Sequence, residues 1–276
     1  MAVTVDNEVP SNSRKLHTIN VKANIKMKIL TIILTLTFLT LTTKGQYSFE
    51  KYPAIKYSKK KNWTEYDKRE KENKMHWTIS LPKFYKDNDS LTIQLTTFGY
   101  KDTSNIRIFK NKKQIQLLVE PYAIGRNFGM LIDTIYFADI NGDSLLDLKI
   151  LCWYGGCGIA SLNERIIYLF QQPDNKFIKV SYIDMAPSQR PERDFDGDGN
   201  YEIITMRLEG YENHNYWTFN LYNFKNGNLE CVNDKYDYPI MIQYLFKANY
   251  KITDKISKEK MKTFSKKLPD YFDKKY

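Results

Sequence analysis

Cysteine and histidine are scarce in this 276-residue chain, which has three of each. It contains no Cys-x-x-Cys pair and no Gly-x-Ser-x-Gly sequence, so zinc-ribbon, thioredoxin-like and α/β-hydrolase chemistry have no support. A Ser-His-Asp or Cys-His arrangement would have to recruit His76 or His214. This scarcity weighs against nucleophilic or acid-base catalysis, and we predict no catalytic residue.

The chain also lacks an apolar run of about 20 residues, the length that a membrane-spanning helix requires. Its longest such run, 29–41, has a short basic start and is followed by small polar residues. This order is typical of a secretory signal peptide, and no cysteine follows it that could carry a lipid anchor. We therefore predict an upstream extension over 1–26, a signal peptide over 27–45 and a secreted or periplasmic mature protein without a transmembrane span.

Positive charge is in modest excess. Removal of residues 1–45, which hold six basic and two acidic residues, lowers the formal net charge from +10 to +6. Much of the excess lies in 59–61 and 255–267. An exported protein seldom meets nucleic acid, so we expect solvated ends or weak attraction to an anionic envelope polymer rather than a nucleic-acid surface.

Two stretches of nine residues, 139–147 and 194–202, place oxygen-bearing side chains at positions 1, 3, 5 and 9. Side chains at this spacing converge when the backbone curls around a point, and Ca²⁺ takes about six to eight oxygen ligands, backbone carbonyls included. Surface turns are the alternative, because Asp, Asn and Gly also favour turns. The sequence predicts one or two Ca²⁺ ions held by Asp139, Asn141, Asp143, Leu145 and Asp147, and by Asp194, Asp196, Asp198, Asn200 and Glu202.

The two loops differ from EF-hands, which have a bidentate Glu at position 12 and flanking helices. Position 12 is Ile150 in one loop and Thr205 in the other, and an apolar strand is predicted after each loop. The pattern resembles the calcium loops of FG-GAP and VCBS repeats in β-propellers, and those of small periplasmic calcium-binding immunity proteins. The resemblance covers residues 130–235. It implies a binding or inhibitory role, against a cell-wall hydrolase for example.

The loops mark an internal repeat with an offset of 55 residues, and each is followed by a similar succession of strands and turns. We predict an all-β fold, namely a small or incomplete propeller-like array of antiparallel blades with a short C-terminal helix. A twisted β-sandwich is the second choice. The expected segments are a charged arm or linker over 46–74, a β repeat domain over 75–250, and a basic helix and tail over 251–276. Asp254 is expected to cap this helix, which is predicted over 256–267.

The strands that carry this prediction are rich in β-branched and aromatic residues. They are predicted at 76–81, 90–97, 106–110, 114–119, 134–138, 148–154, 165–171, 176–183, 203–208, 216–224 and 229–232.

The three cysteines make an odd number for an oxidising compartment. Cys152 and Cys157 flank a Trp-Tyr-Gly-Gly turn, and whether they form a disulfide is left open. We expect Cys231 to be a buried free thiol.

The sequence thus favours an exported, calcium-binding, non-enzymatic β protein that presents a surface to a protein or to a polysaccharide or peptidoglycan-related partner. Its aromatic connections at 153–154 and 211–217 either form the contact surface or pack between blades. The alternative is a calcium-supported secreted hydrolase, of the carbohydrate-active kind, that uses two facing carboxyl groups. An adhesin fragment is a third possibility, which the lack of a long repeat array disfavours.

Overall fold

A computed structural model describes residues 47–65, 74–98, 102–122, 124, 131–244 and 256–276. The chain divides into two units, 1–50 and 51–276. Only residues 47–50 of the first unit are described, and they begin a short 3-10 helix, η1 (Ser48–Lys51). The signal peptide and upstream extension that the sequence predicts lie outside the described residues.

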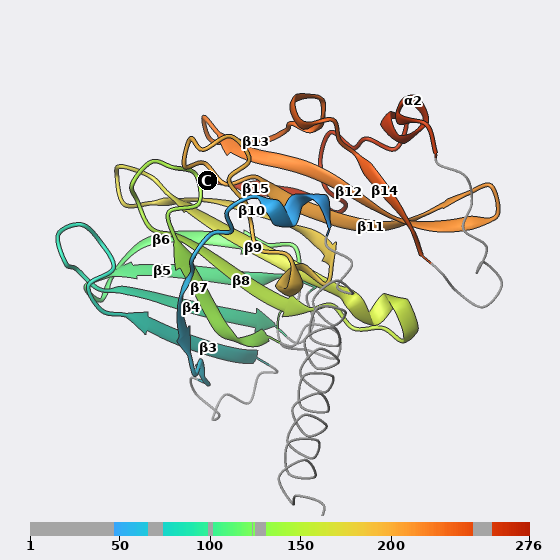
Figure 1. Ribbon diagram of the computed structural model, residues 1–276. Helices are drawn as coiled ribbons and strands as arrows, with labels where there is room; N and C mark the ends of the chain where they lie inside the picture. Colours follow the sequence, from blue (N-terminus) through green and yellow to red (C-terminus); the bar gives the residue numbers. More distant parts are fainter. Residues whose placement is uncertain (1–46, 66–73, 99–101, 123, 125–130, 245–255) are drawn as a thin grey trace, which may run out of the picture. The chain divides into compact units, whose positions relative to one another are not determined.

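The second unit contains three antiparallel sheets, labelled in Figure 1. The first, here called the N-terminal sheet, has the order β2-β3-β4-β5-β6. In β4 and β5 buried and partly exposed residues alternate, as expected for strands with one face on a core. The bounds are β2 Thr64–Glu65, β3 Lys74–Leu81, β4 Leu91–Phe98, β5 Ser104–Lys110 and β6 Lys113–Glu120.

The central sheet has the order β1-β7-β8-β9-β10-β15. Strands β8, β9 and β10 are buried along nearly their whole length, so both faces of this part of the sheet are covered, whereas β7 is only partly buried. Its two edge strands, β1 and β15, come from the two ends of the described unit. The bounds are β1 Ser58–Lys61, β7 Leu131–Ala138, β8 Asp147–Trp153, β9 Asn163–Gln171, β10 Phe177–Met185 and β15 Asp273–Lys275.

The C-terminal sheet is built on β12 (His214–Lys225). One edge of β12 pairs with β11 along nine residues, while β13 and β14 share the other edge. The remaining bounds are β11 Ile203–Tyr211, β13 Asn228–Cys231 and β14 Ile240–Tyr244, with short 3-10 helices η2 Gly158–Leu162, η3 Pro187–Gln189 and η4 Asn233–Tyr236.

Two hydrophobic cores lie on the two faces of the central sheet. Ile150 of β8 belongs to the core shared with the N-terminal sheet, and its neighbour Leu151 belongs to the core shared with the C-terminal sheet. Successive residues of a strand point to opposite faces of the sheet, so a strand that is apolar throughout contributes side chains to both cores. The second core includes a parallel stack of Phe170 and Phe224, with ring centroids 3.6 Å apart. The three sheets therefore form successive layers.

The all-β fold class is confirmed, and the predicted strands match β3 to β13 within a few residues. The propeller-like arrangement stays a prediction, because face-to-face layers do not themselves define a ring of blades. No helix within the described ranges is long and apolar enough to cross a membrane.

The C-terminal helix is shorter than predicted. It spans α2 (Lys258–Lys262), and the Ser257 hydroxyl accepts a hydrogen bond from the Lys260 amide at 3.2 Å. Asp254, the expected cap, lies outside the described residues. Beyond Lys262 the amides of Phe264 and Ser265 donate to carbonyls three residues earlier, and the Lys266 amide donates to the Asn220 side chain at 3.0 Å, so the α-helical ladder does not continue.

Candidate metal centre

The second loop, 194–202, leads directly into β11 and is curled by its own carboxylates. Asp194 accepts hydrogen bonds from the amides of Gly197 at 2.6 Å and Gly199 at 3.2 Å. Asp198 accepts from the Asn200 amide at 2.8 Å. Both glycines have positive φ, +81° and +84°, which side-chain-bearing residues adopt at a cost. The Asp-Gly sequence thus folds into the tight curl that its spacing predicts.

Three carboxylates converge in this loop. One oxygen each of Asp194, Asp196 and Glu202 lies within 4.8 Å of the others. Glu202 is fully buried, and its Oε2 accepts from the Phe195 amide at 3.0 Å. In the same loop the Oδ1 of Asn200 is buried and receives no hydrogen bond from the described residues, while its Nδ2 donates to the Phe224 carbonyl at 3.3 Å. Oxygens of like charge this close favour a hard cation between them, so the residues fit a metal ion.

Two neighbours from η4 already contact these acids. The Lys235 ammonium pairs with Asp196 and holds the pKa of that carboxyl below its ordinary value. The Tyr236 hydroxyl donates to Glu202 at 2.9 Å. Burial nevertheless raises the pKa of Glu202, with the Asp196 charge adding to the effect. Lys235 therefore supplies part of the positive charge that a bound cation would supply.

The first loop, 139–147, connects β7 to β8 and has the same backbone frame. Asp139 accepts from the amides of Gly142 and Ser144, each at 2.8 Å. Asp143 accepts from the Leu145 amide at 2.8 Å. These bonds join the same loop positions as those in the second loop, so the two sequences form equivalent turns.

The first loop differs at its ninth residue. Asp147 is fully buried, and its two oxygens accept from the amides of Ile140 at 2.9 Å and Gln171 at 2.8 Å. Burial raises its pKa well above the ordinary value. At position 3 an amide, Asn141, replaces a carboxylate and donates to Asp143 at 3.0 Å. Within the described ranges, a converging group of three acidic side chains occurs only in the second loop.

The two loops lie against each other. A Cβ added to Gly142 would sit 3.1 Å from the backbone of Gly199 and Asn200. The Tyr201 amide donates to the Ile140 carbonyl at 2.9 Å. The first loop belongs to the central sheet and the second begins the C-terminal sheet, so this contact joins the two layers.

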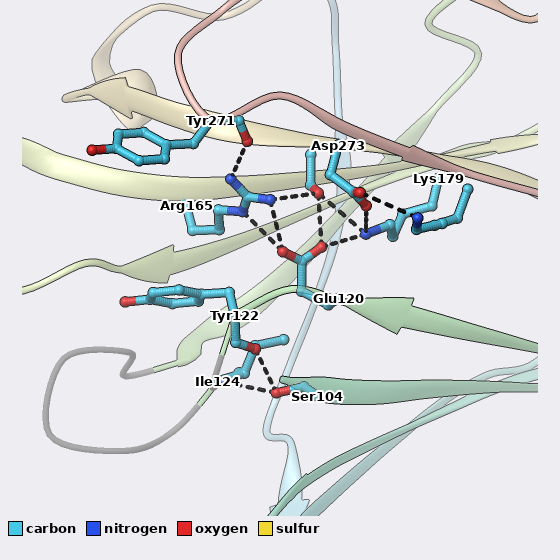
Figure 2. Close-up of polar contacts among 10 residues, drawn as sticks. Ser104, Glu120, Tyr122, Ile124, Arg165, Lys179, Tyr271 and Asp273 are labelled. Carbon is cyan, nitrogen blue, oxygen red and sulfur yellow. Dashed lines mark hydrogen bonds and ion pairs between the residues drawn. The ribbon is translucent and has the colours of Figure 1, made fainter. Parts of the chain in front are cut away.

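A buried charged network that the sequence analysis missed lies between β6 and the central sheet (Figure 2). Glu120 is fully buried and accepts from Arg165 at 2.8 and 2.9 Å and from Lys179 at 2.6 Å. Lys179 also pairs with Asp273 of β15 at 2.6 Å, and Ser181 donates to Glu120 at 2.7 Å. All acceptors of Glu120 are thus engaged.

Two further buried acids pair with cations. Glu192 accepts from Lys149 at 2.6 Å, and the hydroxyls of Tyr57 and Tyr168 also donate to it. Asp184 pairs with Arg190 at 2.6 Å. A signal for these groups existed in the sequence, because Lys149 and Lys179 interrupt apolar strand segments and Arg165 begins one, where an isolated charge is costly unless paired.

The cysteines and aromatic connections also have defined surroundings. Cys152, Cys157 and Cys231 are all free thiols; Cys152 is buried and Cys157 exposed. Cys231 is a free thiol as predicted, but it is partly exposed rather than buried. Trp153 donates to the Ser161 carbonyl at 3.1 Å, and Tyr154 stacks on Tyr122. These two aromatics pack within the protein, and a role in contacting a partner stays a prediction.

No family model matches the chain, and neither the curated proteins nor the solved structures that were searched include a match. The resemblance to FG-GAP and VCBS repeats therefore rests on the two loop sequences.

Proposed function

We propose that this protein is exported, binds calcium through its second loop and acts without enzymatic activity by presenting a metal-stabilised surface to an envelope macromolecule. The observation that carries the calcium assignment is the convergence of Asp194, Asp196 and Glu202. Export is supported by the signal-like segment 27–45 of the sequence.

Calcium is favoured over magnesium by the kind of ligands available. The loop offers several carboxylate oxygens, an amide oxygen at Asn200 and backbone carbonyls, on a backbone that already curls. Ca²⁺ accepts such a set in variable geometry, whereas Mg²⁺ demands a near-ideal octahedron and gives up water reluctantly. Bound calcium would relieve the repulsion among the acids and so stabilise the contact between the two loops. The predicted second ion, in the first loop, is less well supported because Asn141 replaces a carboxylate at position 3 and no three acidic side chains converge in that loop among the described residues.

The test is thermal unfolding of the protein in EDTA, in Ca²⁺ and in Mg²⁺, with an Asp196→Asn, Glu202→Gln variant beside it. A ligand that binds only the folded state adds about 2.7 kcal/mol at a hundredfold excess over its Kd. We expect a calcium-selective rise in Tm that the double variant loses. Asp174→Asn, at an exposed turn, is the matched control and should keep the rise. An unchanged wild-type Tm would contradict the calcium assignment.

A hydrolase remains the alternative, and one pair of acids bears on it. Glu164 lies opposite Asp184 across β9 and β10. Asp184, however, is held by Arg190 and by the amides of Met185 and Met206. A carboxylate fixed by three donors is poorly suited to act as a nucleophile or base, so the pair supports the binding role more than the enzyme.

The partner we propose is a cell-wall polymer or a hydrolase that acts on it. Calcium-loaded protein should co-sediment with purified peptidoglycan, or should slow peptidoglycan digestion by a cell-wall hydrolase, and the Asp196→Asn, Glu202→Gln variant should do neither. Release of soluble fragments by the protein alone would instead favour the hydrolase.

A further inference from the structure

A cavity of about 430 Å³ borders β1, β7 and β8 of the central sheet. The rest of its wall comes from the segment 55–59, which leads into β1, and from the segment 187–191, between β10 and β11. None of the residues of the two Asp-rich loops lines it. Its volume falls within the range of small-molecule sites, about 300–1,000 Å³.

The strand register places three of the lining side chains on one face of the central sheet. Lys59 of β1 is directly opposite Tyr136 of β7, and Tyr136 is in turn opposite Lys149 of β8. Directly opposite residues of an antiparallel pair point to the same face, and all three residues line the cavity. Tyr168, opposite Lys149 on β9, belongs to the core shared with the C-terminal sheet. The cavity therefore lies on the same face as that core, nearer to the β1 edge of the sheet.

Two tyrosine rings form the aromatic part of the wall. Tyr57 and Tyr136 are partly exposed, and their rings meet edge to face with centroids 5.7 Å apart. The Tyr57 hydroxyl donates to the buried Glu192 at 2.6 Å, which fixes the position of this ring. Pro187 and Pro191 add rigid apolar surface to the same wall. A sugar ring presents C–H groups that pack on aromatic rings, and rings that are fixed in advance lose little freedom on binding.

The charge in the wall is positive. Lys56, Lys59 and Lys149 line the cavity, and no acidic side chain does. Lys149 is 4% exposed and its charge is offset by Glu192, which lies behind the wall and is 1% exposed. Lys56 and Lys59 are exposed, and neither forms an ion pair within the part of the chain that the structure describes. The Lys59 ammonium lies 5.3 Å from the centroid of the Tyr136 ring, so positive charge and aromatic surface occur side by side.

We propose that this cavity, here called the Tyr136 cavity, binds a carboxylate-bearing sugar unit of an envelope polysaccharide. The sugar ring packs on Tyr57 and Tyr136, and its carboxylate lies next to the ammonium groups of Lys56 and Lys59. Aromatic rings alone would suit a neutral sugar and lysines alone would suit any anion, so their combination carries the assignment. The inference rests on the envelope role proposed above, for which it names the partner as an anionic polysaccharide.

The test uses digalacturonate and its neutral counterpart galabiose, which has hydroxymethyl groups in place of the carboxylates. Each sugar is titrated into ¹⁵N-labelled protein in EDTA at low ionic strength, and the backbone amide signals of Lys59 and Tyr136 are followed by NMR. We expect saturable shifts with digalacturonate and a Kd at least about fivefold lower than for galabiose, because one exposed ion pair contributes up to about fivefold and two lysines are available. Equal Kd values for the two sugars, or no saturable shift with digalacturonate, would overturn the proposal.

Two lysine variants of the same strand separate recognition in the cavity from general attraction. Lys59→Gln should raise the Kd for digalacturonate about two- to fivefold and leave that for galabiose unchanged. Lys60→Gln is the matched control, because Lys60 is also exposed, does not line the cavity and points to the opposite face of β1. It removes the same charge and should bind both sugars like the wild type. Unaltered binding in Lys59→Gln, or an equal loss in both variants, would contradict the proposal.

The design also separates this inference from the proposed function. The titration in EDTA does not depend on the second loop, so binding of digalacturonate without a calcium-dependent rise in Tm would support the Tyr136 cavity and contradict the calcium assignment. Co-sedimentation of the calcium-loaded protein with peptidoglycan, without binding of digalacturonate, would overturn the Tyr136 cavity and leave the envelope role in place.

Discussion

The two Asp-rich loops share one backbone frame but differ in what their side chains can do. In both, residue 1 accepts from the amides of residues 4 and 6, and residue 9 accepts from the amide of residue 2. In the first loop the short Asp147 spends its second oxygen on the Gln171 amide. In the second loop the second oxygen of the longer Glu202 accepts from the Tyr236 hydroxyl, and this side chain lies in the group formed with Asp194 and Asp196.

This difference teaches that the spacing of oxygens predicts a turn more reliably than it predicts a metal site. In both loops backbone amides donate hydrogen bonds to the carboxylates. Whether a cation is needed depends on how many carboxylate oxygens converge in the loop. The loop in which three carboxylates converge differs from the other by one methylene group at position 9, Glu202 in place of Asp147, and by one carboxylate at position 3, Asp196 in place of Asn141.

The largest effect is expected at position 4, where the two loops differ most in surroundings. Gly142→Ala should lower the free energy of unfolding by about 2–4 kcal/mol, because φ is +75° and the new methyl would press on Gly199 and Asn200. Gly197→Ala, the equivalent change in the second loop, meets open space and should cost only the backbone strain, about 1–2 kcal/mol. Urea denaturation measures the free energy of unfolding of both variants. An equal decrease in the two would show that the packing of Gly142 against the second loop does not stabilise the protein.

Position 9 should give the next largest effect. In the wild type both oxygens of Asp147 accept from backbone amides, so Asp147→Asn places an NH₂ group against one of these N–H donors. The change should lower the free energy of unfolding by about 1–3 kcal/mol. Glu202→Gln can turn its NH₂ toward the Tyr236 hydroxyl and should cost less in EDTA, yet abolish the calcium-dependent rise in Tm. A larger loss in EDTA for Glu202→Gln than for Asp147→Asn would reverse the comparison.

Position 6 provides a smaller, reciprocal test. Ser144 has φ of +64°, where the second loop has Gly199. Ser144→Gly should stabilise by up to about 1 kcal/mol, and Gly199→Ser should destabilise by about 1–2 kcal/mol. Denaturation midpoints of the two variants would reveal whether the loops are equivalent at this residue; a destabilising Ser144→Gly would indicate a side-chain contribution.

The smallest effect on stability is expected from Lys235→Gln. The exposed pair with Asp196 contributes less than about 1 kcal/mol, but its ammonium competes with a cation, so the variant should bind calcium more tightly. Lys235 lowers the pKa of folded Asp196; the resulting stability is present above the ordinary pKa and is lost as the pH falls through the lowered one. In EDTA, wild type should therefore lose slightly more stability than the variant on acidification in that window. Unchanged calcium affinity would count against competition.

Most strands with an apolar pattern were predictable from the sequence, although β14 (Ile240–Tyr244) was missed, whereas the charged edge strands β1 and β15 were not predictable. β1 reads Ser-Lys-Lys-Lys and is exposed throughout, and β15 reads Asp-Lys-Lys. Such strands form because a neighbour offers an unpaired edge, and their lysines discourage further pairing. No hydrophobic period marks them, so composition alone suggests a solvated segment.

The sequence predicted that the two loops form equivalent turns, but it did not show which of them can hold a cation. Asp147 of the first loop accepts from the amide of Gln171, which lies on β9, and Asp196 of the second loop pairs with Lys235, which lies in η4. Both come from segments distant in sequence, which the spacing within the loop cannot show.

The pairing of β15 with β10 has a consequence for the order of synthesis. Asp273 pairs with Lys179 across 94 positions of sequence, so the central sheet keeps an open edge, and Lys179 lacks one of its two acids, until residues 273–275 have been made. The middle layer is thus completed only by β15, which follows every other strand of its sheet in the chain.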